Sequence, residues 1–235
     1  MTPLARGAVL RAPARPADLA ALCGAGGVLV IAPHPDDESL GMGAAIAMAV
    51  DAGRGVQIAA LTSGNRSHAS SRVPPAALAR LRARELREAA RRLGAAPPVM
   101  LGHDDQAAPE APSAQEVARL AALADRIRAT AIWTCWRHDP HPDHRRGARY
   151  AARLAAALAL PRPVEVPVWG RFTDTPPDRP VLRLAAPDWA LRCKARAIAA
   201  HRSQMTPLIP DDRAGFVMDP ATRAHFEAEP ELFLP

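Results

Sequence analysis

The chain has 235 residues, of which 49% are apolar, so it is long enough for one large domain with a sizeable core. Its formal net charge is +6, but Lys194 is the only lysine, and no basic run alternates with aromatic residues. This composition argues against nucleic-acid binding. Because no window approaches ~18 uninterrupted apolar residues, we also expect no membrane insertion.

The cysteines and the N-terminal segment indicate where the protein works. The three cysteines, Cys23, Cys135 and Cys193, are odd in number and contain no C-x-x-C pair, which argues against a disulfide framework. We therefore expect a reducing compartment, and the cytoplasm in particular. Residues 1–26 contain scattered arginines but no apolar stretch typical of a secretory signal. We expect a short N-terminal extension over 1–26, followed by a single domain over 27–235.

The first part of the domain alternates between buried strands and helices. Apolar runs predict strands over 27–32 and 56–61, and the stretch 39–53 between them predicts a helix. Residues 65–75 are polar and contain two prolines, which predicts a loop. Leucines at roughly helical spacing then predict a helix over 76–93 that ends at Gly94.

The same alternation continues in the second part. Strands are predicted over 99–101, 131–136, 164–172 and 180–185. Helices are predicted over 113–130, where Ser113 and Glu116 form a capping box, over 145–159, and over 187–204 with Asp188 as a cap. Strands that alternate with helices predict an α/β fold, namely a Rossmann-like three-layer sandwich with a mostly parallel sheet.

Two dense polar stretches follow directly on predicted strands. The first is "PHPDDE" (33–38) and the second is "RHDPHPDH" (137–144). In a parallel sheet the ligand site lies beyond the carboxyl ends of the strands. The predicted fold therefore places both stretches on one rim of the sheet.

The residue types in these stretches are those of a divalent metal site. His34 and Asp37 are three residues apart at a strand-to-helix turn and can be aimed at one point. The alternative is that Asp36 or Asp37 simply caps the helix. Three of the eight histidines fall within 138–144, next to Asp139 and Asp143. Two imidazoles and one carboxylate are a typical ligand set for a metal that keeps a position open for water.

The sequence resembles a known family at these positions. "APHPDDE" (32–38) together with "HPDH" (141–144) is similar to the PIG-L/LmbE-like zinc-dependent deacetylases, which remove acyl groups, usually acetyl, from amino-sugar derivatives. The resemblance extends over residues 27–204 through "ALTSG", "RARE", "LGHDD", "VPVWG" and "KARAIAAHRSQ". In "ALTSG", Ser63 stands where the family has an aspartate.

The resemblance implies that His34, Asp37 and His144 hold Zn²⁺ and that Asp36 is the general base. Zinc lowers the pKa of its water to ~7, so a neighbouring carboxylate can take the proton at neutral pH. It also implies that His141 stabilises the developing oxyanion or protonates the leaving amine.

Three further residues complete the expected site. The resemblance implies that Asp143 orients a neighbouring imidazole. Arg82 and Asp105 are candidates for binding sugar hydroxyls. For Arg82 the alternative is an ordinary exposed helical arginine. Glu38, although part of the first stretch, is expected to form a structural hydrogen bond.

The leading hypothesis is a zinc-dependent hydrolase that removes the acetyl group from the amide nitrogen of a small N-acetylated amino-sugar conjugate. Alternatives are a zinc amidase for a non-sugar amide or a thiol conjugate, and a non-catalytic metal- or sugar-binding relative. The pattern His34-x-Asp36 with a distant histidine also fits the ferrous oxygenases, but these have all-β scaffolds. Phe226, Leu232 and Phe233 in the tail leave a homo-oligomer open.

"GMGAAI" (41–46) partly matches a dinucleotide-binding fingerprint. It lacks the third glycine, and the preceding carboxylates would repel a pyrophosphate. We therefore reject dinucleotide binding.

Overall fold

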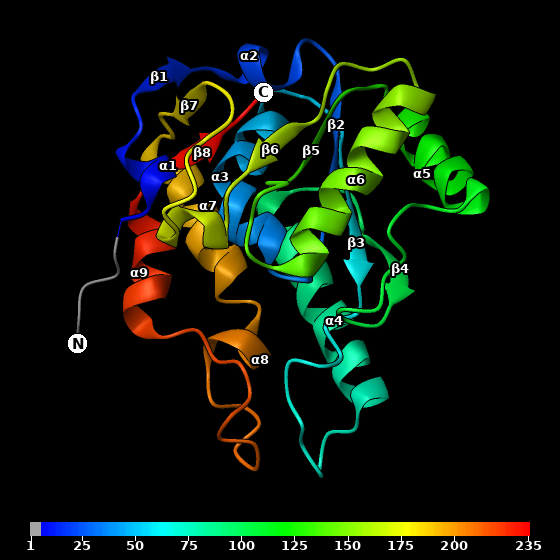
Figure 1. Ribbon diagram of the computed structural model, residues 1–235, viewed down its shortest axis with the longest axis vertical. Coiled ribbons are helices and arrows are strands. Elements are labelled where there is room, and N and C mark those ends of the chain that lie inside the picture. Colours follow the sequence, from blue (N-terminus) through cyan, green and yellow to red (C-terminus); the bar gives the residue numbers. More distant parts are fainter. Residues whose placement is uncertain (1–5) are drawn as a thin grey trace.

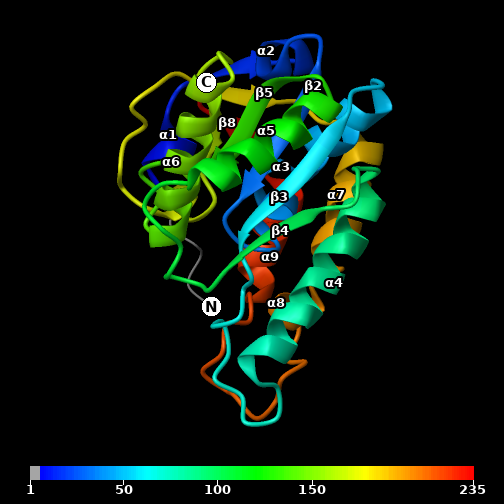
Figure 2. The ribbon, with the colours of Figure 1, turned by 90° about the vertical axis from the view of Figure 1, so that its right-hand side faces the viewer.

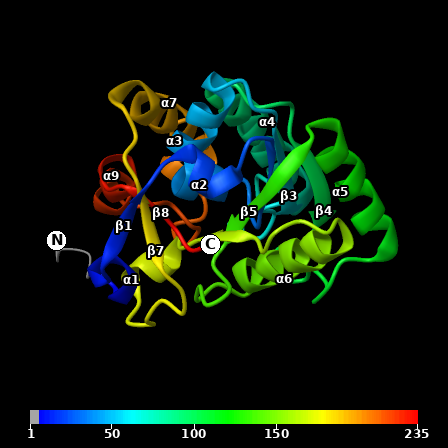
Figure 3. The ribbon, with the colours of Figure 1, turned by 90° about the horizontal axis from the view of Figure 1, so that it is seen from above.

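The computed structural model describes residues 6–235 and contains a five-stranded parallel sheet between two layers of helices (Figure 1). The strand order is β4 (Val99–His103), β3 (Val56–Thr62), β2 (Gly27–Ala32), β5 (Ala129–Cys135) and β6 (Val164–Val166). One face is covered by α3 (Asp37–Asp51), α4 (Pro75–Leu93) and α7 (Asp188–Ile198), and the other by α5 (Ala114–Arg126) and α6 (Pro142–Ala157) (Figure 3). The predicted α/β three-layer sandwich is confirmed.

The central strand β2 is buried on both faces. Val28 and Val30 pack in a cluster with residues of α3 and α4, whereas Leu29 and Ile31 pack with residues of α5 and α6. Successive side chains of a strand point to opposite faces, so a continuous apolar run suits a strand with helices on both sides. The run "GVLVIA" is therefore apolar throughout.

The order of the strands determines where a ligand site can form. From β2 the chain continues to β3 and β4 on one side, and then crosses to β5 and β6 on the other. β5 pairs in parallel with β2, with Ile31 opposite Thr134. The carboxyl ends of β2 and β5 therefore lie side by side at the point where the direction of chain progression reverses, which is the usual ligand position in such sheets.

A second, three-stranded sheet was not predicted. Its order is β1 (Ala14–Ala17), β7 (Val181–Leu184) and β8 (Glu231–Phe233), with β1 parallel and β8 antiparallel to β7. The strand predicted over 180–185 thus forms, but outside the main sheet. The sheet joins both chain ends to the body, because it takes one strand from the N-terminal segment and one from the tail.

The described part of the N-terminal segment and the tail bury apolar side chains. Val9 of α1 (Ala8–Arg11) and Leu22 of α2 (Leu19–Cys23) are each 1% exposed. In the tail, Phe226 of α9 (Pro220–Ala228) and Phe233 of β8 are fully buried. The tail aromatics therefore pack on the body of the same chain.

Several predicted boundaries were correct and others were not. The capping box of Ser113 and Glu116 forms, and Gly94 ends α4 in the left-handed conformation. The helix predicted over 113–130 ends at Arg126, because Ala129 and Thr130 belong to β5. The strand predicted over 164–172 ends at Val166, because Pro167 lacks the N–H that a continued ladder needs. A 3₁₀ helix, η1 (Trp169–Phe172), follows.

Two predicted helices also differ from those observed. The helix predicted over 145–159 begins earlier, at Pro142, so the second polar stretch is itself a helix N-terminus. The helix predicted over 187–204 ends at Ile198 and resumes as α8 (Arg202–Met205), and its cap is Pro187 instead of Asp188. Among residues 6–235, no helix combines the length and the apolar composition needed to cross a bilayer.

The glycines of α3 serve helix packing. A Cβ at Gly41 would lie 2.9 Å from Val166 Cγ1, and one at Gly43 would lie 2.9 Å from Lys194 Cγ. Both positions need glycine because α3 approaches its neighbours closely. This packing role agrees with the rejection of a dinucleotide fingerprint at 41–46.

Candidate metal centre and active site

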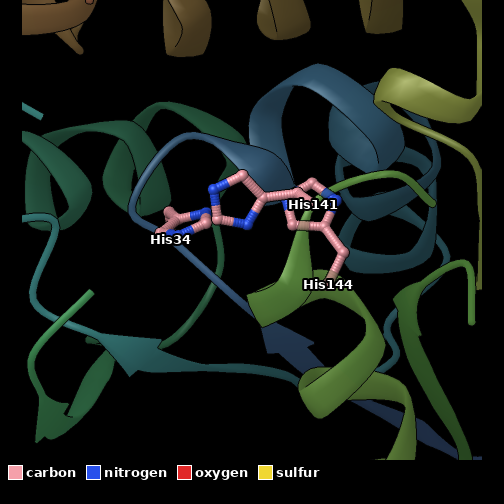
Figure 4. A group of neighbouring side chains, drawn as sticks. All are labelled: His34, His141 and His144. Carbon is pink, nitrogen blue, oxygen red and sulfur yellow. The ribbon is translucent and has the colours of Figure 1, made fainter. Parts of the chain in front are cut away.

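The two polar stretches meet at one edge of the main sheet. The turn after β2 leads into α3 at Asp37, and His141 is the N-cap of α6. Figure 4 shows the imidazoles of His34, His141 and His144 gathered next to one another. The ring centroids of His34 and His141 are 4.6 Å apart, and those of His141 and His144 are 5.1 Å apart.

Asp37 lies between two imidazoles. Its Oδ2 atom is 3.2 Å from His34 Nδ1 and 3.2 Å from His144 Nε2. The three side chains are almost completely buried. Ligand atoms lie within 4.8 Å of one another in two overlapping groups of described residues, His34 with His141 and His144, and Asp37 with Cys135 and His144. Carboxylates and imidazoles are ligands that a divalent cation such as zinc accepts. The structure thus brings together the three residues that the resemblance implied as zinc ligands.

Two further carboxylates contact the outer nitrogens of these imidazoles. Asp143 Oδ2 is 3.1 Å from His34 Nε2, and Asp139 Oδ1 is 3.2 Å from His144 Nδ1. Asp139 also accepts two backbone N–H groups from residues 168 and 170 beside η1. Such contacts orient an imidazole and leave its other nitrogen for a metal. The sequence implied this role for Asp143, whereas Asp139 had no assigned role.

The charges of this group depend on one another. Burial disfavours the charged form of His34, but the hydrogen bonds that its imidazole donates to the carboxylates of Asp143 and Asp37 raise its pKa to about 9. Burial would raise the pKa of Asp37, but His144 and His34 hold it well below its usual range. A bound cation would take the place of protons on the imidazoles.

Asp36 adopts an uncommon backbone conformation. Its φ is 141°, a value that residues other than glycine rarely adopt. Glu38 Oε2 accepts the Asp36 N–H at 3.0 Å, and Arg82 Nη2 donates to the Pro35 carbonyl at 2.6 Å. These contacts hold the strained turn, and such strain concentrates at functional sites.

The carboxylate of Asp36 has a buried cationic partner. Arg82 Nη2 is 3.2 Å from Asp36 Oδ2, and the Arg82 side chain is 3% exposed. Arg82 is therefore not an ordinary exposed helical arginine. Burial raises the pKa of Asp36 to about 6, against the lowering effect of Arg82. Arg82 also lines the pocket described below, so its contact with a sugar stays a prediction.

Glu38 is held by hydrogen bonds in the core and does not line the pocket described below. It is fully buried, and its Oε1 atom is 2.9 Å from His201 Nε2 and accepts the Ser39 hydroxyl. His201 leaves the helical conformation at the break between α7 and α8 and so reaches Glu38. The structural hydrogen bonding predicted for Glu38 is confirmed.

His141 contributes a neutral imidazole. Its Nδ1 atom accepts the backbone N–H of Asp143 at 3.2 Å. Burial and the neighbouring His34 and His144 lower the pKa of His141 to about 4. The neutral ring must then carry its proton on Nε2, because Nδ1 is an acceptor.

A pocket of about 530 Å³ opens over this centre. It is lined by His34, Asp36, Asp37, Arg66, Ser67, Arg82, Asp105, Gln106, Pro140, His141, Pro142, Trp169, Gln204 and Phe216. Asp105 is 6% exposed and accepts the N–H groups of Gly64 and Arg66, so it also fixes the turn after β3. Its predicted sugar contact stays a prediction.

The sequence did not identify the aromatic side of this pocket. Trp169 was assigned to a strand, and Phe216 belongs to a tail segment without a recognisable motif.

Two other histidines lie outside the pocket lining: His103 contacts Glu116 at 2.6 Å, and His138 contacts Asp178 at 3.4 Å.

Comparison with known proteins agrees with this geometry. The PIG-L family, described as GlcNAc-PI de-N-acetylase, matches residues 29–155, which is more than half of the chain and includes both polar stretches. The chain belongs to the PIG-L family. A sequence comparison with curated proteins found no match.

Solved structures share the fold. N,N'-diacetylchitobiose deacetylase from Pyrococcus horikoshii is 25% identical, with a TM-score of 0.60, over 78% of this chain and 72% of that chain. A deacetylase mutant of the teicoplanin biosynthetic pathway is 18% identical, with a TM-score of 0.65, over 89% and 97%. 4-Carboxy-2-hydroxymuconate hydratase from Pseudomonas putida KT2440 is 19% identical, with a TM-score of 0.51, over 74% and 78%. Because a hydratase shares this fold, the reaction must be argued from the site.

Proposed function

We propose that this protein is a zinc-dependent N-deacetylase that removes the acetyl group from the amide nitrogen of an N-acetylated amino-sugar conjugate. The observation that carries the proposal is the position of Asp37 between His34 and His144, with Asp36 beside it in a strained turn that lines the pocket. The PIG-L family match and the likeness to a chitobiose deacetylase support N-deacetylation.

His34, Asp37 and His144 would hold the zinc ion, with Asp143 and Asp139 orienting the two imidazoles. Zinc supplies Lewis acidity, which polarises an amide carbonyl and lowers the pKa of water to ~7. The choice of zinc rests on this mixed nitrogen and oxygen ligand set, which has space for an open fourth position.

Asp36 is the proposed general base. A carboxyl group with a pKa of about 6 is ionised at neutral pH and still basic enough to accept a proton from the attacking water. Arg82 keeps this carboxylate in place. Once protonated, Asp36 can return the proton to the leaving nitrogen, which needs it to depart as an amine.

His141 is the proposed oxyanion donor. Its neutral imidazole carries the proton on Nε2, and a preoriented N–H donor stabilises the negative charge that develops on the carbonyl oxygen. Of the two roles implied by the sequence, this one suits a ring whose pKa is about 4 better than proton donation to the amine does.

The alternatives fit the structure less well. The ferrous oxygenases of the H-x-D…H type have all-β scaffolds, whereas this site lies on a parallel sheet flanked by helices. A binding-only relative would have no use for a strained Asp36 in the pocket. A non-sugar amide would use the same chemistry, so only a substrate panel separates it from a sugar amide.

The test is direct. Zinc-loaded protein is incubated with N-acetylglucosamine, N,N'-diacetylchitobiose and N-acetylglucosaminides, and acetate and free amine are measured together with bound zinc. We expect product in equal amounts of acetate and amine, and its loss on chelation and in His144→Gln. His103→Gln is the matched control, because His103 lies outside the pocket lining and should retain zinc and activity. Protein that binds no zinc and yields no product would contradict the proposal.

A further inference from the structure

Two loops that are distant in sequence form one wall of the pocket. The first covers residues 65–73 after β3, and the second covers residues 206–218 between α8 and α9. We call them the paired loops. Both extend from the same end of the molecule, beyond the N-terminus of α4 (Figures 1 and 2). Arg66 and Ser67 of the first loop and Phe216 of the second line the pocket.

Carboxylates of the second loop bind the backbone of the first. Asp211 accepts hydrogen bonds from the Ser70 hydroxyl at 2.9 Å and from the Ser71 N–H at 3.0 Å. Asp212 accepts the Ala69 N–H at 2.6 Å. Two neighbouring side chains thus satisfy donors at the tip of the other loop, which would otherwise face water.

A close contact and a backbone hydrogen bond then fix the position of Phe216. His68 is 5% exposed and packs on Gly215, where a Cβ would lie 2.2 Å from His68 Cδ2. Only glycine fits there. The next residue, Phe216, donates its N–H to the Ser67 carbonyl at 2.9 Å. The paired loops therefore hold Phe216 at the pocket by contacts from both sides.

The Phe216 side chain adds an apolar surface to a pocket whose lining also contains polar groups. It is 37% exposed, and its ring lies 5.8 Å from the ring of Trp169 at an angle of 84°. Arg66, Gln106 and Gln204 add hydrogen-bonding groups to the same lining. An amino-sugar ring has an apolar face of C–H groups and a rim of hydroxyls, so it needs both kinds of surface.

We propose that Phe216 is a specificity-determining residue, which with Trp169 forms the wall against which the sugar ring of the substrate packs. This inference rests on the proposed function. Because the two rings meet edge to face, a ligand can stack on the face of only one of them. The face of a pyranose is similar in size to an aromatic ring, whereas a single acetyl methyl group is much smaller. Phe216 would select the amine part of the amide, while the metal centre acts on the acyl part.

The first experiment compares Phe216→Ala with Val217→Ala, a neighbour that is 39% exposed but does not line the pocket. The substrates are N-acetyl-, N-propionyl- and N-butyrylglucosamine. We expect Phe216→Ala to lower kcat/KM by about tenfold for all three, mainly through KM, which corresponds to ~1.4 kcal/mol of ring packing. Phe216→Tyr should restore the wild-type value, and Val217→Ala should keep it.

Two outcomes would overturn the inference. A loss that grows with acyl length would show that Phe216 contacts the acyl chain. Equal kcat/KM values for Phe216→Ala and wild type would show that the ring has no role in selection.

A binding measurement separates this inference from the proposed function. Calorimetric titration of zinc-loaded protein with glucosamine should show binding that weakens about tenfold in Phe216→Ala. If the protein hydrolyses none of the amides but binds glucosamine in a Phe216-dependent way, the proposed function fails and the inference stands. If it hydrolyses the amides without any dependence on Phe216, the proposed function stands and the inference fails. If it neither hydrolyses amides nor binds glucosamine, both are wrong.

Discussion

The metal centre and the paired loops line the same pocket but are held in place differently. In the metal centre, short turns after β2 and β5 carry the functional side chains, and fully buried carboxylates such as Asp139 and Asp143 orient them. In the paired loops, Asp211 and Asp212 hold backbone groups near the solvent-exposed tip. The chemistry thus lies on rigid elements, and the expected selection of substrate lies on loops.

The difference in burial has a physical consequence. A carboxylate that is 0% exposed, such as Asp139, is scarcely screened by water, and loss of its partner leaves an uncompensated group in the core. Contacts at an exposed loop tip are screened and compete with water, so each contributes little. The effects of substitutions in the two regions should therefore differ in size, and they should change different kinetic constants.

The largest effect is expected at Asp36. Asp36→Asn removes the general base but keeps a similar shape, so kcat should fall by about 10²–10⁴-fold while bound zinc is unchanged. Steady-state kinetics and metal analysis of the same preparation check this. Activity close to that of wild type would remove Asp36 from the base role.

An intermediate effect is expected at the carboxylates that orient the imidazoles. Asp139→Asn should weaken zinc binding by about 10–100-fold, because His144 loses its charged partner. Competition with a chromophoric chelator measures the affinity. Asp125→Asn, at an exposed position of α5, is the matched control and should bind zinc like wild type. Unchanged affinity in Asp139→Asn would mean that the buried carboxylate contributes only to folding.

The smallest effect is expected in the paired loops. Asp211→Asn weakens the contacts with Ser70 and Ser71, so KM for N-acetylglucosamine should rise by about 2- to 10-fold. Zinc affinity and kcat should stay at wild-type values, since the strand-end turns are untouched. A fall in zinc affinity would show that the loops and the metal centre are not independent, which would contradict the comparison.

Much of the candidate metal centre was predictable because its residues lie in two short stretches, each directly after a strand. A continuous apolar run and the helices that flank it identify "GVLVIA" as a central strand, and a parallel sheet brings the carboxyl ends of its strands to one edge. His34, Asp37 and His144 could therefore be placed together from two short stretches. The capping box at Ser113 was equally local, because both partners lie within one helical turn.

Other features depended on contacts between distant segments. The burial of Arg82 follows from its ion pair with Asp36, and a helical pattern alone cannot distinguish it from its exposed neighbours. The second sheet unites Ala14–Ala17, Val181–Leu184 and Glu231–Phe233, which are short strands with weak individual signals. The observed helix ends differ from the predicted ones where a residue joins a strand, as Thr130 does, or bonds across the core, as His201 does.

The sequence by itself determined the α/β architecture and the two strand-end stretches that contain the candidate metal ligands, since periodicity and strand-end position are local properties of the chain. Only the tertiary structure decided that Asp139 contacts His144 and that Asp143 contacts His34, because both aspartates lie in the same short stretch. It alone also placed Phe216 beside Trp169. That position arises from hydrogen bonds between two loops more than a hundred residues apart, and no local pattern encodes them.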